Sequence, residues 1–239
     1  MECILEVCVD NIESARKAEA GGADRIELCQ ALAVGGLTPS LGFLRKIKEN
    51  LNIPVFTMIR ARDGDFSYSE LEVEQMKDDI RAALSVGING FVLGALRKNN
   101  VDKEVCYSLL KECGNKPVTF HRAFDLIEDS SVALSDIIEL GFSRILTSGH
   151  STSAYKGMEN IKSFIEKVES RIIIMPGCGI NVMNLKEIKD FTGATEYHSS
   201  AQLPRAVVED NNVVKGTTYH PMTSIEIVKK MKTILCSYS

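Results

Sequence analysis

Two Glu-x-Cys pairs near the start of the chain are the residues best suited to do chemistry. Glu6 and Cys8 lie in the run ILEVCV, and Glu27 and Cys29 lie in the run RIELC. A thiolate is a soft ligand that selects Cu(I), whereas a carboxylate can act as a general base or pair with a cation. Which chemistry applies depends on whether the four side chains point into one site, and that is decided by the elements that carry them.

Length and composition narrow the class of protein. The chain has 239 residues, a net charge of −4 and 25 % charged residues, which argues against a nucleic-acid-binding surface. No apolar run approaches the length of a membrane helix. The seven cysteines are an odd number without a CxxC pair, so we expect reduced thiols in a cytoplasmic protein that has neither a membrane nor a nucleic acid as partner.

Short apolar runs alternate with amphipathic stretches along the whole chain, which predicts an α/β fold of parallel strands with outer helices. The predicted strands are 4–9, 25–29, 54–60, 90–94, 117–121, 144–148, 172–176 and 196–200. The predicted helices begin near residues 11, 40, 69, 102, 131, 157, 181 and 223. Eight units of about thirty residues are typical of a (β/α)8 TIM-type barrel, here a single domain over residues 1–239.

An open doubly wound sheet is the alternative architecture. No GxGxxG follows the first strand, so this alternative lacks its dinucleotide fingerprint, and we expect no nucleotide cofactor. Residues 201–222 show no sustained periodicity and contain a proline and adjacent asparagines. We predict an irregular loop there, after the eighth strand, and such loops are more often surface excursions than parts of a site.

Strand parity predicts which side chains enter the barrel, because successive strand residues face opposite ways and the outward set packs on the helices. In the first strand, Leu5, Val7 and Val9 form the apolar outward face, which leaves Glu6 and Cys8 inward. The same rule turns these further polar side chains inward: Arg25, Glu27, Cys29, Arg60, Thr119, His121, Glu196 and His198. We expect the two histidines to approach the carboxylates from across the barrel.

Buried charges without partners are costly, so these groups must pair with one another, with a ligand or with a metal. A Glu–Arg network that only fills the barrel is one interpretation. The other is a site at the carboxyl ends of the strands, where barrels place their ligands. There Glu6 or Glu27 could act as general base, His121 or His198 as general acid or base, and Arg60 could hold an anionic group.

Cys8 and Cys29 take equivalent inward positions on adjacent predicted strands, which would lie about 4.8 Å apart. Two sulfurs at that spacing could share one Cu(I) ion, with Met58 on the next strand as a thioether donor. A free cysteine is more often a small buried hydrophobe. A disulfide between the two is also geometrically feasible.

Several long stretches occur in an order that is typical of one protein family: LEVCVDNIESARKAEAGGADRIELC, GGLTPS, MIRARDGDFSYS, PVTFHRAFD, RILTSG, IIIMPGCGI and EYHSSA. On these stretches the sequence resembles the CutC copper homeostasis proteins, to about Ala201. The resemblance implies a cytoplasmic TIM-type barrel involved in copper tolerance or Cu(I) binding, with no established catalytic reaction. It also implies Cys8 and Cys29 as copper ligands and a cleft lined by Glu6, Glu27, Arg60, His121 and His198.

The sequence departs from the usual pattern of this family at three places. Residues 60–66 read RARDGDF where relatives tend to carry RPRGGDF, Cys178 interrupts a glycine triplet, and Gln202 replaces an arginine. Glycine-rich loops after the last two strands of a barrel often bind phosphate through backbone amides. The second and third departures therefore weaken a phosphate-binding interpretation, and Cys178 adds a thiol at the mouth whose ordinary explanation is a surface substitution.

Two functions remain open at this point. The first is a cytosolic copper homeostasis protein that binds Cu(I) through Cys8 and Cys29. The alternative is a TIM-barrel enzyme that acts on a small anionic metabolite through the Glu, Arg and His cluster, with an indirect link to copper. A homo-oligomer is compatible with both. An interaction scaffold ranks last, because a polar barrel mouth suits a small ligand better than a flat partner.

Overall fold

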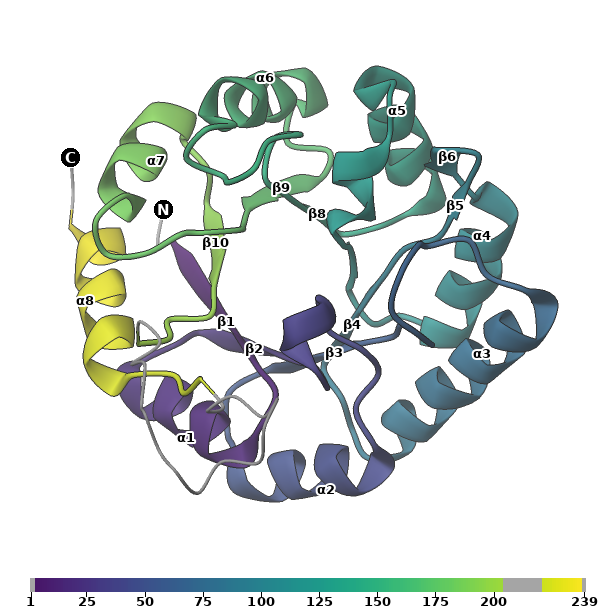
Figure 1. Cartoon of the computed structure of the whole chain (residues 1–239), viewed down its shortest axis with the longest axis horizontal. Helices are drawn as coiled ribbons and strands as arrows, with labels where there is room; N and C mark the ends of the chain where they lie inside the picture. The colour runs from purple at the N-terminus through teal and green to yellow at the C-terminus, as the bar shows by residue number, and fades with distance from the viewer. Residues whose placement is uncertain (1–2, 204–220, 238–239) are drawn as a thin grey trace, which may run out of the picture.

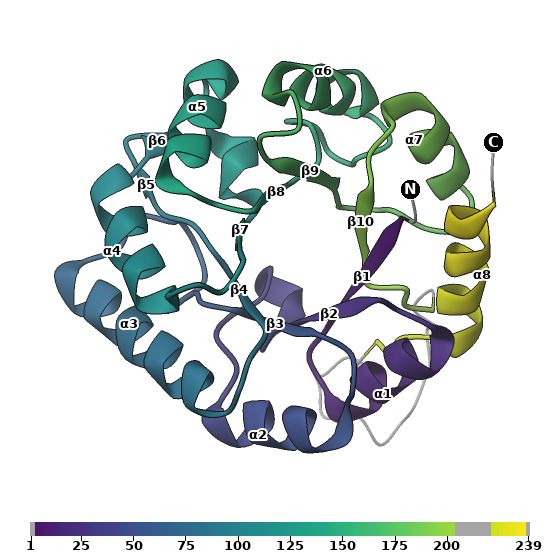
Figure 2. The ribbon, with the colours of Figure 1, turned by 180° about the vertical axis from the view of Figure 1, so that it is seen from behind.

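The computed structural model describes residues 3–203 and 221–237, which form a nearly closed barrel of eight parallel strands inside a ring of α-helices (Figure 1). The barrel strands are β1 (Ile4–Val9), β2 (Arg25–Leu28), β3 (Val55–Met58), β4 (Gly90–Leu93), β7 (Val118–Phe120), β8 (Arg144–Thr147), β9 (Ile173–Pro176) and β10 (Glu196–Ser199). Their hydrogen-bonded order is β10-β1-β2-β3-β4-β7-β8-β9. β9 and β10, at the two ends of this order, lie side by side (Figure 2). The predicted (β/α)8 barrel is confirmed.

Helices follow the strands as predicted. They are α1 (Ile12–Gly21), α2 (Leu41–Asn50), α3 (Glu70–Ser85), α4 (Lys103–Cys113), α5 (Ser130–Leu140), α6 (Met158–Val168), α7 (Leu185–Thr192) and α8 (Ile225–Cys236). Capping residues explain where helices begin. At α3, for example, Ser69 and Glu72 form a reciprocal capping box. α7 begins later than predicted, because the Asn184 side chain accepts the Asn181 N–H at 2.9 Å and holds a turn ahead of the helix.

A small antiparallel hairpin was not predicted. Its strands, β5 (Leu96–Arg97) and β6 (Asn100–Val101), are joined by Lys98 and Asn99, both with positive φ. Two such residues make the turn that suits a two-residue hairpin. Most of the loop predicted at 201–222 falls on residues 204–220, which lie outside the described residues.

Strand parity is confirmed by where the side chains pack. Leu5, Val7 and Val9 lie in the large apolar core between the barrel and its helices. Inside the barrel, a separate small apolar cluster contains Cys29, Phe56, Met58 and Val92. The inward faces of the other strands carry the polar side chains of the candidate site, together with apolar ones such as Leu146 and Met175. None of the helices in the described part of the chain combines the length and apolar character that a membrane span requires.

Candidate functional site

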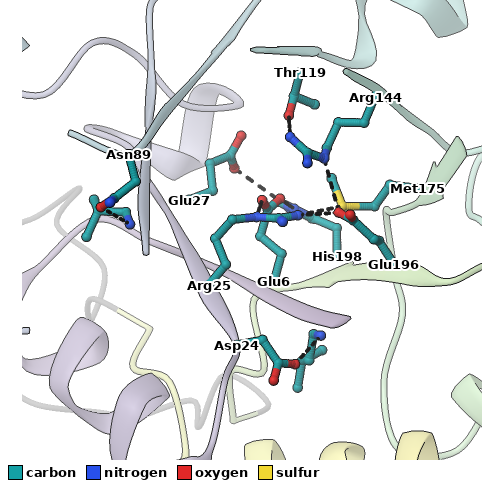
Figure 3. Close-up of polar contacts among 12 residues, drawn as sticks. Glu6, Asp24, Arg25, Glu27, Asn89, Thr119, Arg144, Met175, Glu196 and His198 are labelled. Atoms are coloured by element: carbon teal, nitrogen blue, oxygen red, sulfur yellow. Dashed lines mark hydrogen bonds and ion pairs between the residues drawn. The ribbon is translucent and has the colours of Figure 1, made fainter. Parts of the chain in front are cut away.

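An ion-pair network fills the barrel at the amino-terminal ends of the strands (Figure 3). Arg25 Nε donates to Glu6 Oε2 at 2.5 Å, and Arg25 Nη2 donates to Glu196 Oε2 at 2.6 Å. Arg144 Nε reaches the same Glu196 oxygen at 3.0 Å, and its Nη1 donates to Thr119 Oγ1 at 3.3 Å. The interpretation of a Glu–Arg network that fills the barrel therefore holds for Glu6, whose partner is Arg25.

Glu6 also orients a histidine. Its Oε1 lies 2.8 Å from His198 Nδ1, and the β1–β10 register places Glu6 opposite His198. His198 thus approaches from the neighbouring strand and not from across the barrel, because β10 closes the barrel against β1. Burial alone would raise the pKa of Glu6, but Arg25 and His198 bring it well below its usual range. The ionised Glu6 carboxylate accepts a hydrogen bond from His198 Nδ1–H. The other ring nitrogen of His198, Nε2, then faces the cavity.

Cys8, Glu27 and His198 form a compact group of donor atoms, which we call the triad. One ligand atom from each lies within 4.8 Å of the others, and all three side chains are buried. His198 Nε2 is 3.7 Å from Glu27 Oε2, and Figure 3 marks this contact with a dashed line. Within the described residues, Glu27 Oε1 is buried without a hydrogen-bond partner. This donor set suits a soft or borderline cation, which a thiolate and an imidazole would hold with a carboxylate oxygen.

The two predicted copper ligands are not at equivalent positions. The β1–β2 register places Cys8 opposite Glu27 and Val9 opposite Leu28, so Cys29 lies one inward step further toward the mouth. Strands must be staggered for a sheet to close into a barrel, and the stagger separates residues that a flat alignment makes neighbours. All seven cysteines are free, so the disulfide considered between Cys8 and Cys29 is not formed.

Cys29 occupies an apolar position. It is fully buried against Phe56, Met58 and Val92, and a Cβ added at Gly36 would lie 2.9 Å from its sulfur, so the loop packs directly on the thiol. Burial, and then the nearby Glu27 carboxylate, raise the pKa of Cys29 well above its usual range. The thiol therefore stays protonated unless a cation displaces the proton.

The protonation states of Glu27 and His198 depend on each other. Burial is the main cause that raises the pKa of Glu27 to about 7, and Glu6 adds to it, while His198 opposes it. Burial lowers the pKa of His198, but Cys8 and Glu27 outweigh burial and raise it well above its ordinary value. A bound cation would replace the protons that Glu27 and His198 hold.

A cavity of about 460 Å³ opens at the carboxyl ends of the strands and contains the triad. Arg60 and His121 also line it, whereas Glu6 and Cys29 do not. Arg60 stacks on the Phe66 ring at 4.8 Å, and the His121 ring lies 4.6 Å from the same ring. The predicted site residues that line the cavity therefore separate into the triad and a second pair, Arg60 and His121, around Phe66.

Asp125 is a residue at the cavity that sequence reasoning missed. Its carboxylate accepts from the backbone N–H groups of Ser148 and His150 and from the Thr147 hydroxyl, and it pairs with Arg122 at 2.9 Å. It thereby fixes the loop after β8. The stretch PVTFHRAFD contains Asp125, but nothing in its pattern predicts the 3-10 helix over Arg122–Leu126 that turns the carboxylate toward this loop.

Cys178 lies at the cavity as predicted for a third thiol at the mouth. It has a φ of 82°, in the left-handed region that favours glycine. Its sulfur is 3.5 Å from the carbonyl oxygen of Thr152. The glycine triplet of the family pattern thus fits the backbone of this loop better than the cysteine does.

Comparison with known proteins identifies the family. The CutC family model matches residues 3–203. The human copper homeostasis protein cutC homolog is 53 % identical over 203 residues, covering 84 % of this chain and 74 % of that protein. The mouse homolog is 52 % identical over 238 residues, covering 97 % and 88 %. The crystal structure of CutC from Streptococcus agalactiae superimposes with a TM-score of 0.80 at 34 % identity, covering 83 % of this chain and 98 % of that one. The chain therefore belongs to the CutC family of copper homeostasis proteins.

Proposed function

We propose that this protein serves copper homeostasis in the cytoplasm by binding Cu(I) at the triad, with Cys8 and His198 as the principal ligands. The observation that carries the proposal is that donor atoms of Cys8, Glu27 and His198 lie within 4.8 Å of one another in a buried site. The names of the mammalian relatives support copper as the cargo.

The surroundings of the triad favour a soft ion. A thiolate and an imidazole nitrogen are ligands that Cu(I) accepts, and the carboxylate of Glu27 would be the weakest of the three donors. Glu6 holds the His198 ring through Nδ1 at 2.8 Å, which is the arrangement that commonly orients a metal-bound histidine. Cys29 and Met58 lie in the barrel interior, one inward step from the triad toward the mouth. There the Cys29 sulfur would be an additional, weaker ligand once its proton is displaced.

The cytoplasmic location rests on the thiols. All seven cysteines are free, and five of them are buried, a pattern that fits a reducing compartment. Self-association of the barrel stays a prediction.

Competition with a coloured Cu(I) chelator such as bicinchoninate tests the proposal under anaerobic conditions. We expect one tight site in the wild-type protein, loss of that site in Cys8→Ser and in His198→Asn, and a smaller loss in Cys29→Ser. The control is Cys236→Ser, which removes an exposed thiol at the end of α8 and should leave the affinity unchanged. Wild-type affinity in both Cys8→Ser and His198→Asn would refute the proposal.

A further inference from the structure

The loop between β2 and α2 lies at the barrel opening, and we call its residues 30–37 the arm. Its two ends pair as an isolated antiparallel bridge: Gln30 N donates to the Leu37 carbonyl oxygen at 2.9 Å, and Leu37 N donates to that of Gln30 at 2.7 Å. The tip of the arm is a one-turn 3-10 helix, Leu32–Val34, which lies inside the ring of strands in both Figure 1 and Figure 2. The arm therefore projects over the site from a paired base.

The arm separates the Cys29 sulfur from the cavity. Gly36 is buried, and a Cβ added there would lie 2.9 Å from that sulfur. Leu32 packs against the small apolar cluster that contains Cys29, and it also lines the cavity, whereas Cys29 does not. Cys8 lines the cavity directly. The arm thus leaves one thiol facing the cavity and covers the other.

Polar contacts, and not apolar burial, hold the tip of the arm in place. None of the three residues of its 3-10 helix is buried, and Val34 is 43 % exposed. Arg60 Nη1 donates to the carbonyl oxygens of Val34 at 2.9 Å and Gly36 at 3.1 Å. Asp10 Oδ2 accepts the Leu32 N–H at 3.1 Å. Segments with little buried apolar surface open locally at a lower free-energy cost than the core, so we expect the tip to open without unfolding of the barrel.

The backbone at the two ends of the tip is suited to such a movement. Ala31, before the tip, has a φ of 53°, and Gly35 and Gly36, after it, have φ values of 90° and 89°. Alanine takes this left-handed conformation at a steric cost, whereas glycine takes it freely. The closed arm therefore holds a strained residue on one side of the tip and two permissive residues on the other.

We propose that the arm is a gate on the copper site, which Arg60 and Asp10 hold shut and whose opening lets Cu(I) reach the Cys29 sulfur. This inference rests on the proposed function, because it names how a further ligand of that site becomes available. When the arm opens, the Cys29 thiol releases its proton to solvent and its sulfur binds the ion, with no change in the oxidation state of copper.

Labelling of metal-free protein with N-ethylmaleimide, followed by mass mapping of each cysteine, tests the gate. Cys29 and Cys106 are both 0 % exposed, but Cys106 lies on α4 in the core between the barrel and its helices. Because global unfolding exposes both thiols, the ratio of their labelling rates reports the arm. We expect Cys29 to be labelled about tenfold faster than Cys106, or more, because opening of the tip requires less free energy than unfolding of the core.

Two variants should open the gate. Asp10→Ala removes the acceptor of the Leu32 N–H, and a hydrogen bond to a charged group is strong enough that the labelling ratio should rise about tenfold. Gly36→Ala places a methyl group against the Cys29 sulfur and should also raise the ratio. Gly87→Ala is the matched control, because Gly87 has a φ of 78° but nothing lies within 4 Å of the added methyl group. It should keep the wild-type ratio.

Stopped-flow transfer of Cu(I) from bicinchoninate measures the consequence for copper. Gly36→Ala should take up Cu(I) several-fold faster than wild type, and the double variant Gly36→Ala with Cys29→Ser should lose that gain. The gate is overturned if Cys29 and Cys106 are labelled at equal rates in the wild type, or if both opening variants keep the wild-type ratio. Unchanged uptake in Gly36→Ala overturns its role for copper. A wild-type protein that binds no Cu(I) refutes the proposed function as well, whereas equal labelling rates refute the gate alone.

Discussion

Replacing Glu27 by glutamine should stabilise the metal-free protein at alkaline pH, although it removes a proposed ligand. Burial raises the pKa of Glu27 to about 7, against an ordinary value of 4.5. The folded protein therefore holds this proton more tightly than the unfolded chain does, and stability falls as the pH rises from 4.5 to 7. At 1.36 kcal/mol for each pKa unit, the loss is about 3 kcal/mol above pH 7.

Glutamine cannot ionise, so Glu27→Gln avoids that loss. We expect the variant to be more stable than wild type by up to about 3 kcal/mol at pH 8, and by much less at pH 5, where Glu27 is protonated in the folded protein. Urea denaturation of metal-free protein at pH 5, 6, 7 and 8 measures the difference. Glu166→Gln, at an exposed position of α6, is the control and should show no such trend. A Glu27→Gln variant that is no more stable than wild type at pH 8 would contradict a Glu27 carboxyl whose pKa is raised by burial.

Three further perturbations address the groups around the triad. Arg25→Met leaves the buried Glu6 and Glu196 short of a cation, so urea denaturation should show a loss of about 3–5 kcal/mol; a loss below 1 kcal/mol would contradict the network. Glu6→Gln replaces a charged acceptor of the His198 Nδ1 hydrogen bond by a neutral one, so chelator competition should show Cu(I) affinity about 10–100-fold weaker. An unchanged affinity would argue against a role of Glu6 in orienting the His198 ring. Asp125→Asn weakens the hydrogen bonds that the carboxylate accepts from the loop after β8, so amide hydrogen exchange should accelerate at Ser148 and His150. Unaltered exchange at these two amides would contradict the role of Asp125 in holding this loop.

Sequence periodicity predicted the barrel because the core between strands and helices depends only on which faces are apolar. Leu5, Val7 and Val9 identify the outward face of β1, and the inward orientation of Glu6 and Cys8 follows from alternation. Glycine and capping residues then located the helices to within a few residues. These are local properties, and the sequence contains them in full.

The partners of the inward side chains could not be predicted in the same way. Strand stagger places Glu27, and not Cys29, beside Cys8, and stagger is a property of the closed barrel. Strand parity placed Arg60 on the same barrel interior as the carboxylates, but the loops that follow β2 and β3 supply the carbonyl oxygens that hold it. Such long-range contacts arise from loop paths that no short sequence pattern specifies.

The central claim, that Cu(I) is bound by the Cys8 sulfur and the His198 nitrogen, is tested most directly by X-ray absorption at the copper edge. Protein loaded with one equivalent of Cu(I) should show both a sulfur and an imidazole scatterer in the wild type. Cys8→Ser should change the sulfur contribution, and His198→Asn should remove the imidazole signature. A wild-type spectrum without sulfur, or spectra of both variants that match wild type, would contradict the claim.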